Sequence, residues 1–188
     1  ACLKVQKNLS GRDWRDTDEF VFRIDALGNT ATSMIETPKP TDTTIKIDES
    51  TKNHIAEFGD VTFTAPGEYR YVITEDSDTN PINGIDYSAA RYLVVVKVID
   101  DGIGHLDVES VDIVQRLDDE GLEPSNQPEI TDYTMTFTNK YQVDMATTNI
   151  DGVKNYSDYS GGNSIEAGKF SFQLKPLGGY VTAVGSTG

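Results

Sequence analysis

The chain has 188 residues and a formal net charge of −15, which argues strongly against nucleic acid and anionic membranes as partners. Its single cysteine, Cys2, rules out an intrachain disulfide and a cysteine-based metal site. No apolar run is long enough to span a bilayer and no signal peptide is recognisable, so we expect a mature or excised segment without membrane insertion.

Apolar and polar residues alternate in several stretches, and this period of two predicts β-strands. The expected strands cover residues 3–9, 20–24, 44–47, 68–75, 87–98, 106–114 and 133–141. Turn signals and polar loops separate them, and no stretch sustains the 3.6-residue apolar period of a helix. The pattern therefore predicts an all-β sandwich.

Three of these strands carry a polar residue in an otherwise apolar row. Lys7 lies in the first such row, Glu75 continues a row in the middle of the chain, and Asn139 interrupts the last. Lys4 is an alternative to Lys7, but alternation turns it to the opposite face. A buried carboxamide must find hydrogen-bond partners or lose roughly 1–3 kcal/mol.

These three residue types can form a covalent bond if they meet in a core. Burial favours the neutral amine of Lys7 and the neutral acid of Glu75. The amine is a nucleophile towards the Asn139 carboxamide, and a protonated Glu75 could bond to the amide oxygen and pass a proton to the departing ammonia. Two simpler interpretations stay open, namely a lysine whose head reaches water and a plain Lys–Glu ion pair.

Other motifs give weaker signals. His54 and His105 are far apart, without the spacing of metal ligands. The acidic run from Asp76 begins like a calcium loop, but Pro81 and Tyr87 occupy positions that need Gly and Glu. We therefore expect no cofactor and no metal, although another cation site among the acidic loops stays open. A hydrolytic enzyme would need a nucleophile and base, for which the sequence shows no arrangement.

Five blocks in order carry a family resemblance: Lys7–Arg12, Phe20–Ile24, Gly67–Glu75, Gly84–Tyr87 and Phe137–Tyr141. Over about residues 3–142 they resemble the pilin isopeptide-linkage domain of Gram-positive pili and cell-wall adhesins. The resemblance implies an Ig-like antiparallel β-sandwich with a self-formed Lys–Asn bond between first and last strands, promoted by a glutamate. By position these residues are Lys7, Asn139 and Glu75.

The end of the chain echoes its beginning. Residues 144–188 hold half of the 16 glycines, and Phe170–Leu174 repeats the pattern of Phe20–Ile24. We expect a sandwich domain over 1–143 and the opening strands of a second similar unit over 144–188, with Lys154 as its cross-link lysine.

The expected function is a structural stalk or shaft module of a Gram-positive surface protein, extracellular and anchored to the cell wall. Its expected partners are neighbouring repeats of the same protein, other pilin subunits or host surface ligands. The alternative is a ligand-binding adhesin module that recognises host protein or glycan through its long loops, 28–44 and 117–130.

Overall fold

The computed structural model describes residues 2–31, 36–127, 129–155, 157, 168 and 170–174, and the chain divides into two units, 1–145 and 146–188. The elements of the first unit are β1 (Lys4–Ser10), β2 (Glu19–Asn29), β3 (Thr44–Asp48), the 3-10 helix η1 (Lys52–His54), β4 (Ile55–Glu57), β5 (Gly67–Asp76), β6 (Ile85–Asp86), β7 (Arg91–Asp100), β8 (Leu106–Leu117) and β9 (Thr134–Tyr141).

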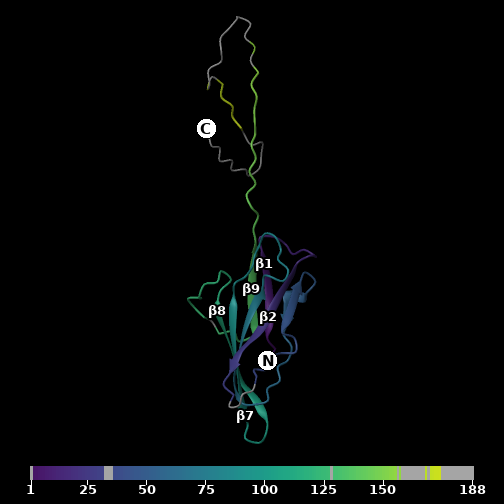
Figure 1. Cartoon of the computed structure of the whole chain (residues 1–188), viewed down its shortest axis with the longest axis vertical. Coiled ribbons are helices and arrows are strands. Elements are labelled where there is room, and N and C mark those ends of the chain that lie inside the picture. Colours follow the sequence, from purple (N-terminus) through teal and green to yellow (C-terminus); the bar gives the residue numbers. More distant parts are fainter. Residues whose placement is uncertain are drawn as a thin grey trace. The chain divides into compact units, whose positions relative to one another are not determined.

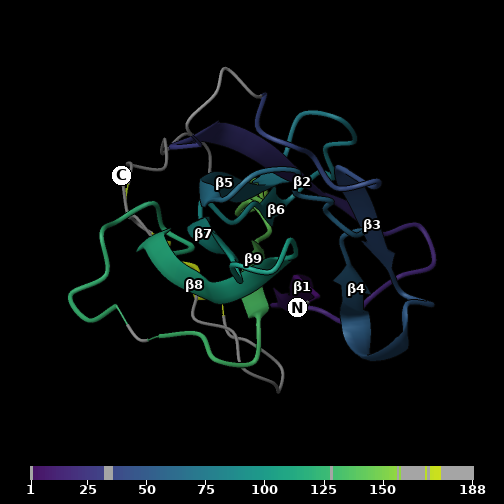
Figure 2. The ribbon, with the colours of Figure 1, turned by 90° about the horizontal axis from the view of Figure 1, so that it is seen from below.

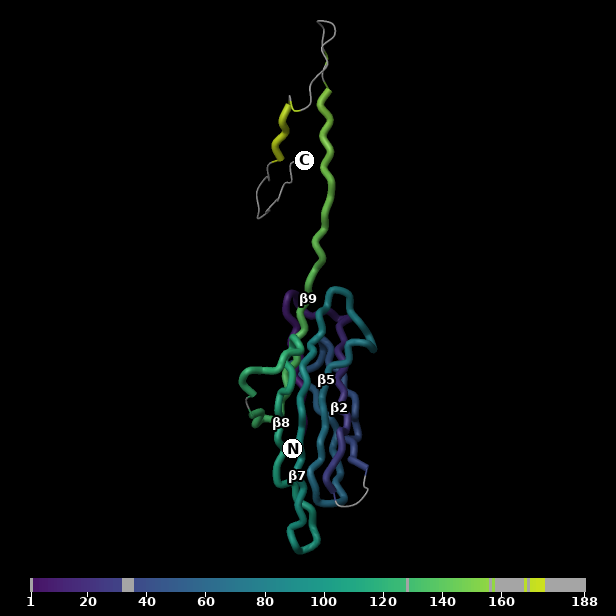
Figure 3. Tube along the Cα trace, turned by 60° about the vertical axis from the view of Figure 1, so that its left-hand side comes forward, coloured from purple at the N-terminus to yellow at the C-terminus, as the bar shows by residue number. Residues whose placement is uncertain are grey.

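The strands of the first unit form two sheets packed face to face (Figure 1). One sheet has the order β4-β1-β9-β6, and the other has the order β3-β2-β5-β7-β8. In Figure 3, β2, β5, β7 and β8 of the second sheet run side by side. Viewed along the strands, β1 and β9 face β2 and β5 across the core (Figure 2). The predicted all-β sandwich is confirmed.

The first and last strands are neighbours and run parallel, whereas the other pairings among the described strands are antiparallel. Lys7 is opposite Phe137, and Leu9 is opposite Asn139. Since successive side chains alternate between faces, Lys7 and Asn139 point to the same side of this sheet, two register positions apart. That side is the core.

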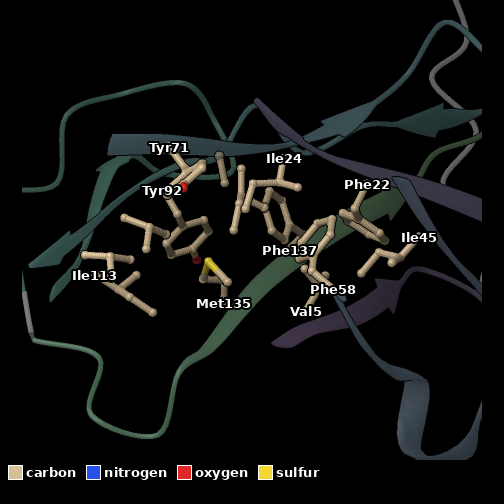
Figure 4. Close-up of a cluster of buried hydrophobic side chains, with 14 of the residues drawn as sticks. Val5, Phe22, Ile24, Ile45, Phe58, Tyr71, Tyr92, Ile113, Met135 and Phe137 are labelled. Atoms are coloured by element: carbon tan, nitrogen blue, oxygen red, sulfur yellow. The ribbon is translucent and has the colours of Figure 1, made fainter. Parts of the chain in front are cut away.

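The space between the sheets is filled by large apolar side chains (Figure 4). The Phe137 ring of β9 lies 5.1 Å from the ring of Phe22 on β2 and 5.1 Å from that of Tyr92 on β7. The Tyr92 hydroxyl also donates a hydrogen bond of 2.6 Å to the main-chain oxygen of Thr136, which links the sheets. The core therefore holds β9 firmly against the opposite sheet. Its other buried members include Val5, Phe20, Ile24, Ile45, Ile47, Phe58, Tyr71, Ile73, Val94, Ile113 and Met135.

β2 and β7 differ most from their predicted bounds, β8 runs three residues past its predicted end, and the short elements β4, β6 and η1 were not predicted. β2 continues to Asn29, through an irregularity in register between Ala26 and Gly28, where residues from 28 onward were expected to form a loop. β7 begins at Arg91 and not at residue 87. The main-chain N–H of Ser88 bonds to the Asn139 side chain and that of Ala89 to the main-chain oxygen of Asp119, so neither pairs with a neighbouring strand. That irregular stretch contributes to the site described below.

In the second unit, none of the described residues lies in a strand, and the Lys154 Nζ is 5.5 Å from the centre of the Phe170 ring. Much of 144–188 is outside the described residues, so the second similar unit stays a prediction. Within the part of the chain that the structure describes, no helix is long and apolar enough to cross a membrane.

Candidate functional site

The three polar residues singled out in the apolar rows meet in the core. Lys7 on β1 and Asn139 on β9 approach Glu75, which comes from β5 of the opposite sheet. The Lys7 Nζ lies 2.8 Å from the Glu75 Oε1, and the Asn139 Nδ2 donates a 2.9 Å hydrogen bond to the same oxygen. One carboxylate oxygen is thus shared by the amine and the amide nitrogen.

The cluster is dry. Lys7 is 1% exposed and Asn139 is fully buried, and the side chain of Glu75 has no exposed surface. The Lys7 Nζ lies 4.8 Å from the centre of the Phe20 ring and 5.7 Å from that of Phe22. Its close contact with Glu75 is an ion pair by distance but lacks the direction of a hydrogen bond, so the amine is poorly satisfied.

Burial shifts both titrating groups towards their neutral forms. Desolvation lowers the pKa of Lys7 to about 8, although the nearby Glu75 carboxylate opposes the shift. Desolvation also raises the pKa of Glu75, against the opposing effects of Lys7 and of hydrogen bonds from Asn139 and Ser88. An uncharged amine and an uncharged acid are therefore more accessible here than in water.

The orientation of the Asn139 carboxamide follows from its partners. The main-chain N–H of Ser88 lies 2.7 Å from Oδ1, and because an N–H can only donate, this atom must be the carbonyl oxygen. The amide nitrogen then faces Glu75. This corrects the expectation that Glu75 bonds to the amide oxygen: Glu75 bonds to the nitrogen that would leave, and Ser88 bonds to the oxygen.

Ser88 and Asp119 belong to the site but were not predicted. Ser88 also directs its N–H at the Glu75 Oε2, 3.1 Å away, and its hydroxyl donates a 2.5 Å hydrogen bond to the Asp119 Oδ1. The same Asp119 oxygen accepts the main-chain N–H of Thr138 at 2.9 Å. Ser88 acts through its main chain, which has no residue signature, and Asp119 is one of several acidic residues in its loop.

The other sequence candidates lie apart from the cluster. The Lys4 side chain is 38% exposed and lies 4.0 Å from Glu57, as expected from alternation. Lys154 belongs to the second unit. The Asp76 carboxylate accepts main-chain N–H bonds from Asp78 and Thr79, so it caps a turn. Among the residues described, no group of three or more His, Cys, Asp or Glu side chains is placed to hold a metal ion.

The β-sandwich with neighbouring first and last strands is the fold expected from the resemblance to the Gram-positive pilin domain. The family model described as "FctA: Spy0128-like isopeptide containing domain" matches residues 3–142. The chain belongs to this family. No curated protein matches the chain significantly.

Solved structures of major pilins share the fold. The Streptococcus pyogenes T-13 pilin is 22% identical, with a TM-score of 0.50 over 75% of this chain and 52% of that one. The T3.2 pilin of the same organism is 18% identical, with a TM-score of 0.50 over 75% and 52%. A point mutant of a Streptococcus pyogenes major pilin is 17% identical, with a TM-score of 0.51 over 74% and 49%. The chain thus spans about half the length of these pilins.

Proposed function

We propose that the first unit is a load-bearing module of a Gram-positive surface protein, a pilus shaft or an adhesin stalk, stabilised by a Lys7–Asn139 isopeptide bond. The observation that carries the proposal is the shared Glu75 oxygen, which lies 2.8 Å from the Lys7 amine and 2.9 Å from the Asn139 amide nitrogen in the buried core. A buried ion pair is often no more stabilising than well-packed apolar residues of similar volume, so stability alone does not account for this cluster.

The geometry supports a reaction in which Glu75 moves the protons. A proton passes from Lys7 Nζ to Glu75, leaving a neutral amine and a neutral acid. The amine adds to the Asn139 Cγ, Glu75 gives its proton to Nδ2 and takes a second proton from Nζ, and the tetrahedral intermediate collapses with ammonia as the leaving group. Two Nζ–H bonds of the charged lysine and the Asn Cγ–Nδ2 bond break, an Nζ–Cγ amide forms, and one ammonia is released, with Glu75 left protonated. The fold supplies the proximity that such a slow reaction needs.

The bond would be well placed to carry force. It would join the first strand to the last, and these strands already lie side by side in parallel. A pull on the N-terminal end of β1 and the C-terminal end of β9 shears this pair. A covalent tie between Lys7 and Asn139 passes that load directly between the two strands, so the residues between them stay folded.

The adhesin alternative receives less support from the loops. In the described part of 28–44, the Thr37 hydroxyl accepts a hydrogen bond from Asn29 and the Pro38 main-chain oxygen accepts one from Tyr71. In 117–130, Asp119 turns towards Ser88 and Thr138. These contacts tie the described parts of the loops around Thr37, Pro38 and Asp119 to the sandwich. Display on the cell wall, and joining to neighbouring repeats or other pilin subunits, belong to the same proposal.

The test is the intact mass of the purified chain. The wild type should weigh one ammonia less than its sequence requires, and the deficit should vanish in Lys7→Ala and in Asn139→Ala. Lys4→Ala is the matched control and should keep the deficit, since Lys4 points away from the core. A wild type of full mass after complete folding would overturn the proposal.

A further inference from the structure

We infer that the main-chain N–H of Ser88 is the oxyanion donor of this cross-linking reaction and that Asp119 is the positioning residue that holds it in place. The inference rests on the proposed function. It concerns how the Asn139 carbonyl is activated, which the Lys–Glu–Asn cluster alone leaves open, because Glu75 is engaged with the amide nitrogen and the amine.

The donor is aimed where charge develops. When the Lys7 amine adds to the Asn139 Cγ, the electron pair of the carbonyl moves onto Oδ1. The Ser88 N–H already lies 2.7 Å from this oxygen in a buried setting. A preorganised donor at such an atom strengthens its bond as the charge grows, and removal of one donor of this kind slows acyl transfer about 100- to 1,000-fold.

The Ser88 N–H can reach Asn139 because residues 87–90 lie outside the strand, and it is shared only with the Glu75 Oε2 at 3.1 Å. β7 begins only at Arg91, so Ser88 has no ladder partner to satisfy there. The next N–H, of Ala89, also points elsewhere and donates to the main-chain oxygen of Asp119 at 2.9 Å. The short irregular segment thus presents a main-chain donor to Asn139 and is fastened to the loop after β8.

Asp119 connects the donor to the strand that bears the electrophile. Its Oδ1 accepts the Ser88 hydroxyl at 2.5 Å and the Thr138 N–H at 2.9 Å, and Thr138 immediately precedes Asn139. Asp119 therefore acts on the groups that flank the reacting atoms. Its negative charge would disfavour both a neutral amine and an oxyanion, so its contribution lies in its acceptor oxygen. Asparagine keeps that oxygen and removes the charge.

The experiment follows folding and bond formation in the same sample. The full chain is made as inclusion bodies, held unfolded in urea and diluted to start folding. Trp14, the single tryptophan, packs on Phe20 and His54, so its fluorescence reports folding. Samples are quenched in acid at successive times, and the loss of ammonia is measured by intact mass spectrometry. The variants are Asp119→Ala, Asp119→Asn and Ser88→Ala.

We expect Asp119→Ala and Ser88→Ala to fold at the wild-type rate and to lose ammonia at least about tenfold more slowly, since a misaligned donor forfeits part of the donor's effect. Asp119→Asn should react within about twofold of the wild type. So should the control Ser10→Ala, which removes a hydroxyl bonded to the main-chain oxygen of Asn139 and leaves the carboxamide untouched.

Wild-type rates in Ser88→Ala and Asp119→Ala would overturn the inference and leave the isopeptide bond standing. Equal slowing of Asp119→Asn and Asp119→Ala would overturn the positioning role, because the asparagine variant keeps the acceptor oxygen on which that role depends. If Asp119→Ala does not fold, Ser88→Ala decides alone. A wild type that never loses ammonia has a different meaning, because it refutes the proposed function itself.

Discussion

Asn139→Ala should cost far more stability when Lys7 is present than when it is absent. The bond would close a loop of about 130 residues between positions 7 and 139, and the chain-entropy model for a cross-link of that length gives about 5 kcal/mol. The substitution also removes local contacts of the carboxamide, but these are lost equally in a Lys7→Ala background, where no bond forms. The difference between the two costs isolates the bond.

The assay is unfolding in urea and by heat, followed by the fluorescence of Trp14, on the wild type, both single variants and the double variant. We expect a coupling of at least about 2 kcal/mol and up to about 5 kcal/mol. For a unit of this size, 5 kcal/mol corresponds to a fall of about 15 °C in Tm. A coupling below about 1 kcal/mol, with Asn139→Ala equally costly in both backgrounds, would refute the reasoning.

Glu75→Gln should have the full mass although Lys7 and Asn139 remain, because a carboxamide cannot transfer the proton. An ammonia deficit in this variant would refute the proton-transfer role of Glu75. Asn139→Ala cannot form the bond and keeps the Lys7 amine. Between about pH 7.5 and about pH 9.5, its free energy of unfolding in urea should rise by about 2 kcal/mol more than that of the same chain with Lys7→Met. The sign follows from the Lys7 pKa, which burial lowers to about 8 from 10.5, so the unfolded chain binds more protons across this window; equal slopes in the two chains would contradict it. Gly11→Ala should lose at least about 2 kcal/mol, because its φ is +87° and a Cβ would lie 2.3 Å from a main-chain oxygen. The control Gly102→Ala, at φ +81° with open space around it, should lose about 1 kcal/mol of unfolding free energy. Equal losses in urea for the two variants would show that the close main-chain contact at Gly11 adds nothing.

Alternation was sufficient to bring out the three clustered side chains. A period of two assigns each residue to a face whatever the partner strand is, so Lys7, Glu75 and Asn139 stood out as polar residues in apolar rows. The same argument separated Lys4 from Lys7, and the structure bears it out, since Lys4 lies at the surface beside Glu57. Their meeting across two sheets depends on topology, for which the family resemblance was needed.

The remaining features depend on contacts that side-chain patterns do not encode. Ser88 contributes a main-chain N–H, which any residue but proline possesses. Asp119 lies between Asp118 and Glu120, and only the folded loop shows which carboxylate turns inward. The late start of β7 also depends on such contacts. The sequence of residues 87–90 is compatible with a strand, but the N–H groups of Ser88 and Ala89 bond to Asn139 and Asp119 and not to a neighbouring strand.

The most direct test is a peptide map of the folded, purified chain. A protease that cuts after free lysines should skip position 7 and release a branched species that joins the segment around Lys7 to the segment around Asn139. Tandem mass spectrometry should then locate the branch at these two side chains, with one ammonia missing. Recovery of two separate peptides, with cleavage at Lys7 and an intact Asn139, would contradict the account.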